Sequence, residues 1–158
     1  MERVEMKLEC MKTLDLKTRW NLHNTSHTER ALVDSQRVKI YKMKFEQARY
    51  FTQSTPRDCM SVDRTKLNVD PNYSKFVFEH GIFENLEIKL SYMVFQILEI
   101  HLKKGGISAK NLTFTSMIPN SPCLFEKFND QLLDTLVIDG FINSLDQLIS
   151  APVCCNSK

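Results

Sequence analysis

Residues 82–104 read IFENLEIKLSYMVFQILEIHLKK, and this stretch decides which fold the sequence predicts. Its apolar residues recur at intervals of three and four, the spacing that places side chains on one stripe of a helix. The residues of this stripe are Phe83, Leu86, Leu90, Met93, Ile97 and Ile100. Lys103 and Lys104 at its end suit the negative pole of a helix dipole. We therefore expect one long buried helix over residues 82–104, ended by the glycines that follow it.

Two helices are expected within the first 52 residues. Residues 1–20 fit helical spacing as well as the alternation of a half-exposed strand, and their Glu, Lys, Met and Leu content favours a helix. Ser26 and Glu29 have the spacing of a capping box, which predicts a helix that begins there and continues to residue 52. Within it, the β-propensity of VKIYKMKF, residues 38–45, leaves a strand open as the alternative.

Proline positions predict the remaining helices. Asp70 followed by Pro71 predicts a short helix that Gly81 stops, and Pro122 predicts the start of another helix over residues 122–149. The sequence suggests no internal repeat. Its fold class is predicted as mainly α, a bundle of four or five helices. In this bundle 1–52 is the first half or an extended arm with coiled-coil character, 53–70 a linker, 71–150 the core and 151–158 a flexible tail.

The second half of the chain supports an alternative fold, α+β with a winged-helix-like C-terminal half. A helix is followed by GGISAKNL at residues 105–112 and later by LLDTLVIDGFI at residues 132–142. This order resembles a winged-helix domain. In that family a turn similar to the one in LLDTLVIDGFI opens the wing. The resemblance implies a recognition helix that contains acidic residues, at Glu126, Asp130 and Asp134. Because such a helix would repel phosphates, the resemblance implies a protein partner rather than DNA.

Charge and composition narrow the class of protein. Residues 1–66 hold 14 Lys/Arg against 9 Asp/Glu and the rest of the chain 7 against 10, so neither half is basic enough to require nucleic acid. The charged start MERVEMKLECMK lacks the apolar core of a signal peptide, and charges interrupt the apolar run of 82–104. We expect a cytoplasmic or nuclear protein with no membrane partner.

No catalytic motif stands out in the sequence. It contains no nucleophile elbow, phosphate-binding glycine loop or dinucleotide fingerprint. His23 and His27 are four residues apart, as metal ligands on one helix can be, but the polar stretch around them reads as a helix boundary. We therefore expect no enzyme and assign no catalytic residue, no cofactor and no metal ligand.

The leading functional hypothesis is a non-enzymatic protein-interaction module, an adaptor or a subunit of a larger intracellular assembly, with a protein partner or a second copy bound through its apolar stripes. Aromatic residues dominate the centres of such interfaces. The predicted anchors are Phe45, Tyr50, Phe51, Phe76 and Phe78. An ordinary core position is the equal alternative for each of them.

A basic stretch over residues 37–49 supports a second hypothesis, a nucleic-acid-associated protein. Basic side chains that alternate with aromatic ones can follow a phosphate backbone and stack on bases. The residues expected to make such contacts are Arg37, Lys39, Lys42, Lys44 and Arg49. The alternative is a solvated surface whose long side chains cover apolar neighbours.

Overall fold

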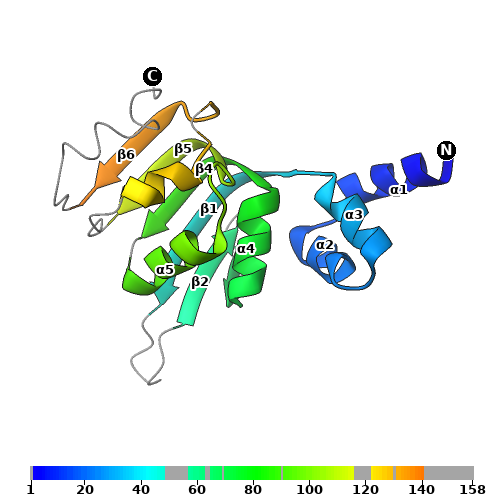
Figure 1. Ribbon diagram of the computed structural model, residues 1–158, viewed down its shortest axis with the longest axis horizontal. Helices are drawn as coiled ribbons and strands as arrows, with labels where there is room; N and C mark the ends of the chain where they lie inside the picture. The colour runs from blue at the N-terminus through cyan, green and yellow to red at the C-terminus, as the bar shows by residue number, and fades with distance from the viewer. Residues whose placement is uncertain are drawn as a thin grey trace. The chain divides into compact units, whose positions relative to one another are not determined.

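The fold was analysed in a computed structural model of the 158-residue chain. The structure describes residues 2–48, 57–62, 65–68, 70–89, 91–115, 122–129 and 131–140. The chain forms two compact units, residues Met1–Val38 and Lys39–Lys158. Figure 1 shows the helices and strands of both.

The first unit consists of three helices, α1 (Glu2–Lys12), α2 (Leu16–His23) and α3 (His27–Asp34). The helical prediction for residues 1–20 is confirmed, with a break at which Asp15 caps α2 by accepting a 2.8 Å hydrogen bond from the amide of Thr18. Ser26 caps α3, and its Oγ accepts a 3.2 Å bond from the amide of Glu29. Both helix starts therefore follow from local capping chemistry.

A mixed six-stranded sheet is the centre of the second unit. Its strands are β1 (Val38–Ala48), β2 (Arg57–Val62), β3 (Thr65–Asn68), β4 (Gly81–Lys89), β5 (Ser108–Thr115) and β6 (Thr135–Asp139), in the order β3-β2-β1-β4-β5-β6. β1, β2 and β3 pair antiparallel, whereas β4, β5 and β6 pair parallel. Tyr41 contacts Asn85, and Lys44 contacts Glu87 further along both strands, so β1 also runs parallel to β4.

The predicted fold class was wrong. The sheet makes this an α/β fold, so it is neither a mainly α four- to five-helix bundle nor a coiled coil. The α+β alternative is overturned as well, because LLDTLVIDGFI supplies the parallel strand β6 where a winged helix requires a helix and a turn into its wing. Residues 53–70, predicted as a linker, contain strands β2 and β3.

Each of the three longest predicted helices contains a β-strand in the structure. Residues 82–104 contain most of β4 and then α5 (Tyr92–His101), while residues 27–52 contain α3 and β1, the strand that the sequence left open. Residues 122–149 contain the 3₁₀ turn η1 (Pro122–Lys127) and β6. Residue 130, residues 141–149 and the predicted tail 151–158 lie outside the described residues.

These strands resembled helices because the alternation of buried and exposed side chains along them is interrupted by two consecutive residues on the same side. The buried hydrophobic residues of β4 are Phe83, Leu86 and Ile88, with intervals of three and then two. The same intervals separate the buried residues Ile40, Met43 and Phe45 of β1 and Ala109, Leu112 and Phe114 of β5. A regular strand alternates every two residues, so a step of three imitates one turn of a helix.

All helical segments of the second unit that the structure describes lie on one side of the sheet (Figure 1). The core forms between them and the buried residues of the strands. Phe78 of α4 (Pro71–His80) packs edge-on against Phe45 and Phe83, with ring centroids 5.2 and 6.1 Å apart. The largest fully buried side chains are Phe45, Phe78, Phe83, Phe114, Met43, Met60, Leu86, Ile88, Leu98, Ile107, Leu112 and Leu124.

Gly81 ends α4 where the sequence predicted. Asp70 caps the start of this helix, and its carboxylate accepts a 3.1 Å bond from the amide of Asn72. Gly81 has an extended backbone that any residue could adopt, with φ −79°. Its role is to leave space, because a Cβ at this position would lie 2.5 Å from Cζ of Phe83 and 2.7 Å from the carbonyl oxygen of Val77.

This close approach yields a first prediction. We expect Gly81→Ala to lower the free energy of unfolding by about 1–3 kcal/mol, because the added methyl group meets a fixed carbonyl and a buried ring. Chemical denaturation followed by circular dichroism measures this change. Lys89→Ala, at the exposed other end of β4, is the control and should stay within about 0.5 kcal/mol. Equal stability of the two variants would contradict the packing described.

Candidate functional site

The candidate site is the side of the sheet opposite α4, α5 and η1, which we call the open face. It is formed by Tyr41, Lys42 and Lys44 of β1, Glu84, Asn85 and Glu87 of β4, Lys110, Asn111 and Thr113 of β5, and Thr135 and Val137 of β6. The interrupted alternation creates it, because β1, β4 and β5 each place two consecutive residues on this side. These pairs are Tyr41–Lys42, Glu84–Asn85 and Lys110–Asn111.

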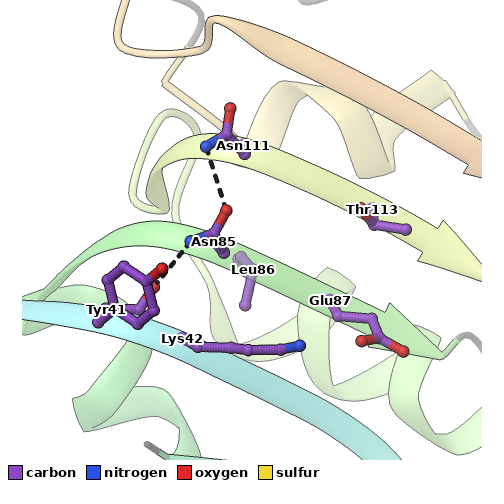
Figure 2. Close-up of a pocket in the computed structure, with 7 residues that line it drawn as sticks. All are labelled: Tyr41, Lys42, Asn85, Leu86, Glu87, Asn111 and Thr113. Atoms are coloured by element: carbon purple, nitrogen blue, oxygen red, sulfur yellow. Dashed lines mark hydrogen bonds between the residues drawn. The ribbon is translucent and has the colours of Figure 1, made fainter.

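A row of hydrogen bonds crosses the open face from β1 to β6, and we call it the ladder. Asn85 Nδ2 donates to the carbonyl oxygen of Tyr41 at 3.2 Å, and Asn111 Nδ2 donates to Asn85 Oδ1 at 3.2 Å (Figure 2). Asn111 Nδ2 also donates to the carbonyl oxygen of Glu84 at 3.0 Å, and Thr135 Oγ1 donates to Asn111 Oδ1. Four neighbouring strands are therefore joined through side chains as well as through their backbones.

The ladder stabilises the sheet and leaves the face around it accessible. Both polar atoms of the Asn111 side chain, Nδ2 and Oδ1, are engaged by the chain itself. This side chain therefore positions the strands rather than holding a ligand. A hollow of about 340 Å³ lies over the ladder, lined by Tyr41, Lys42, Asn85, Leu86, Glu87, Asn111 and Thr113 (Figure 2). A larger groove of about 650 Å³ adjoins it at the N-terminal ends of the parallel strands, and Tyr41 lines both.

Ion pairs hold two lysines of the open face. Lys44 Nζ lies 3.3 Å from Glu87 and 3.5 Å from Glu46. Burial lowers the pKa of Lys44, but the hydrogen bonds and charges of Glu87 and Glu46 together outweigh it and leave the pKa above its usual value. Lys110 Nζ lies 3.0 Å from Glu84, and this hydrogen bond, together with the charge of the same carboxylate, raises the pKa of Lys110. Both lysines are therefore cations that face carboxylates at neutral pH.

Apolar side chains stand among these charges. Tyr41 is 72% exposed, Val137 52% and Leu132, in the segment before β6, 44%. Tyr41 and Leu132 both line the groove. The open face thus combines exposed aromatic and aliphatic side chains with polar groups around a hollow. This combination is common in protein-binding surfaces.

The structure places three of the five predicted anchors in the core. Phe45 and Phe78 are fully buried and Phe76 is buried as well, so these three are core residues, the alternative that the sequence left open. Tyr50 and Phe51 lie outside the described residues. In the described part of β1, the exposed aromatic side chain belongs instead to Tyr41.

The predicted nucleic-acid residues do not form one basic surface in the described part of the second unit. Lys39 and Lys42 are exposed, whereas Lys44 is paired with two carboxylates. Arg37 is exposed in the first unit, and Arg49 lies outside the described residues. Carboxylates among the lysines of the open face would repel a phosphate backbone.

His23 and His27 take different positions in the first unit. His23 ends α2, where its Nε2 lies 3.2 Å from Asp34 Oδ1 and its ring stacks on Trp20 with centroids 5.8 Å apart. His27 is the exposed first residue of α3. The helix boundary expected between them is confirmed.

Sequence reasoning missed the ladder and the repeat that carries it. Residues 84–89 read ENLEIK and residues 110–115 read KNLTFT, each a charged residue, an asparagine, a leucine and then alternating polar and apolar residues. The structure aligns them, since Asn85 pairs with Asn111 and Leu86 with Leu112. In the next strand Thr135 pairs with Asn111. The two segments lie 26 residues apart, so comparing the sequence with itself at that offset aligns them.

Comparisons with known proteins give no family for this chain. No family model, no curated protein and no solved structure matches it significantly. Among the described residues, no helix is long and apolar enough to cross a membrane.

Proposed function

We propose that this chain is a non-enzymatic protein-interaction module, an adaptor or a subunit of a larger intracellular assembly, and that it binds its partner through the open face. The observation that carries this proposal is the exposure of Tyr41 and Leu132, which line the groove, and of Val137 on β6, on a side of the sheet that no described helix of the second unit covers.

The polar part of the open face suits the same role. Ion pairs and the ladder fix its lysine, glutamate and asparagine side chains before a partner arrives, so binding would immobilise few additional side chains. The face also carries exposed apolar side chains on β1 and β6 with these polar side chains between them, so it offers both kinds of contact that protein interfaces use. The partner can be another protein or a second copy of this chain.

A matched pair of variants tests this proposal. We expect Val137→Glu, on the open face, to reduce the amount of captured partner at least tenfold, because it places a charge where an apolar side chain would be desolvated. Affinity capture with the full chain as bait, quantified by mass spectrometry, measures the loss, and light scattering on a sizing column detects self-association.

The control is Ile100→Glu, since Ile100 is 70% exposed on α5 at the other side of the sheet. This variant adds the same charge at a comparably exposed aliphatic position and should leave capture unchanged. Equal losses for both variants would contradict the proposed surface. A chain that stays monomeric at every concentration and captures no protein would contradict the function itself.

A further inference from the structure

The groove at the N-terminal ends of the parallel strands has an apolar wall and charges of opposite sign at its two ends. Ile82 of β4 and Leu132 before β6 line it together with Tyr41. Its volume of about 650 Å³ is within the range of ligand sites. Tyr41 also lines the hollow over the ladder, which lies further along the strands.

The charges of the groove are ordered across the sheet. Lys39 of β1 lies at one end, while Asp134, directly before β6, lies at the other. Between them Lys110 is paired with Glu84 at 3.0 Å and is also attracted by Asp134. Because Glu84 of β4 and Lys110 of β5 offset each other, the β1 end of the groove keeps the positive charge of Lys39 and the β6 end keeps the negative charge of Asp134.

Strand spacing sets the length of the segment that could satisfy both ends. Three inter-strand steps separate β1 from β6, which corresponds to about 14 Å across the strands. An extended peptide covers this distance in about four residues, and residues two apart point to the same side. A peptide crossing the strands would therefore present its first, third and fifth side chains to the groove.

We propose that the groove binds an extended segment of a partner protein with the pattern acidic–x–apolar–x–basic. Its acidic side chain meets Lys39, its apolar side chain enters the groove beside Ile82 and Leu132, and its basic side chain meets Asp134. This proposal rests on the proposed function and specifies the partner's chemistry. Carboxylates at one end of the groove disfavour a nucleic acid there, since every nucleotide carries a negative charge.

Selection from a randomised displayed peptide library tests the pattern. The unchanged protein should enrich peptides in which an acidic and a basic residue lie two positions either side of an apolar one, with one order of the charges preferred. The double variant Lys39→Glu with Asp134→Lys keeps the net charge and should enrich the opposite order. A synthetic peptide of the first kind should bind the double variant at least tenfold more weakly, and the charge-swapped peptide should restore binding.

The matched control exchanges charges at the other end of the same sheet. Lys89→Glu with Asp139→Lys alters exposed residues at the C-terminal ends of β4 and β6 and should leave the preferred order unchanged. No enrichment, enrichment without a charge pattern, or an unchanged order in the Lys39/Asp134 variant would overturn this proposal. If Val137→Glu still abolished capture of a partner, the proposed function would stand and only the peptide pattern would fail.

Discussion

Phe114→Ala is expected to lower the free energy of unfolding by about 3–5 kcal/mol, the largest loss predicted for any substitution in this chain. Phe114 lies near the C-terminal end of β5 with 0% of its surface exposed. Its ring meets Phe125 and Phe128 edge-on, with centroids 5.7 and 5.5 Å apart. Removing the ring leaves a cavity between the sheet and η1 that these neighbours fill only in part. Chemical denaturation followed by far-ultraviolet circular dichroism measures the loss.

This variant also distinguishes the sheet from the helical bundle that the sequence predicted. In that bundle Phe114 lies between the helices predicted over 82–104 and 122–149, where truncating a phenylalanine would cost less. Val137→Ala is the control, because Val137 lies on the adjacent strand with half its surface exposed and should lose less than about 1 kcal/mol. A loss below about 1 kcal/mol for Phe114→Ala would contradict the core described here.

Asn111→Asp is expected to destabilise the chain by about 3 kcal/mol although it changes the size of the side chain hardly at all. Asn111 donates to two oxygen atoms, the Glu84 carbonyl and Asn85 Oδ1. A carboxylate in its place offers no donor and would repel both acceptors. Leaving partly buried acceptors without a donor costs about 1–3 kcal/mol for each group. Denaturation midpoints at neutral pH measure this effect.

Thr113→Asp separates the lost donor from the added charge. Thr113 lies two residues further along β5 on the same face, and it is half-buried like Asn111. This variant adds the same carboxylate while the ladder stays intact, so we expect a loss of less than about 1 kcal/mol. If Thr113→Asp destabilised the chain as much as Asn111→Asp, the charge would be responsible and the ladder would contribute little.

Local signals in the sequence predicted individual helix ends well. Asp70 and Pro71 mark the start of α4, Gly81 its end, and Ser26 the start of α3. Capping involves residues within about four positions of one another, so the chemistry that decides it is present in a short window of sequence. The predicted fold class was wrong because the fold depends on pairing between distant segments.

The stretch 82–104 shows the physical origin of that failure. Its first part pairs with β5, a segment 26 residues away, and Phe83, Leu86 and Ile88 face the helices. The step of three between Phe83 and Leu86 exists because Glu84 and Asn85 both lie on the open face. Only the neighbouring strands make this interruption favourable, since Asn85 bonds to β1 and to Asn111. A step of three between apolar residues is also the spacing of one helical turn, so the periodicity of this stretch predicts a helix.

The sequence by itself determined the capped helices α3 and α4, the helical character of residues 1–20, and a surface with too little excess positive charge to require nucleic acid. These properties depend on near neighbours or on composition. The tertiary structure alone decided that β1, β4, β5 and β6 form one parallel set and that Tyr41, Asn85, Asn111 and Thr135 lie side by side on it. Hydrogen bonds between strands join residues far apart in sequence, and no local preference specifies which segments will meet.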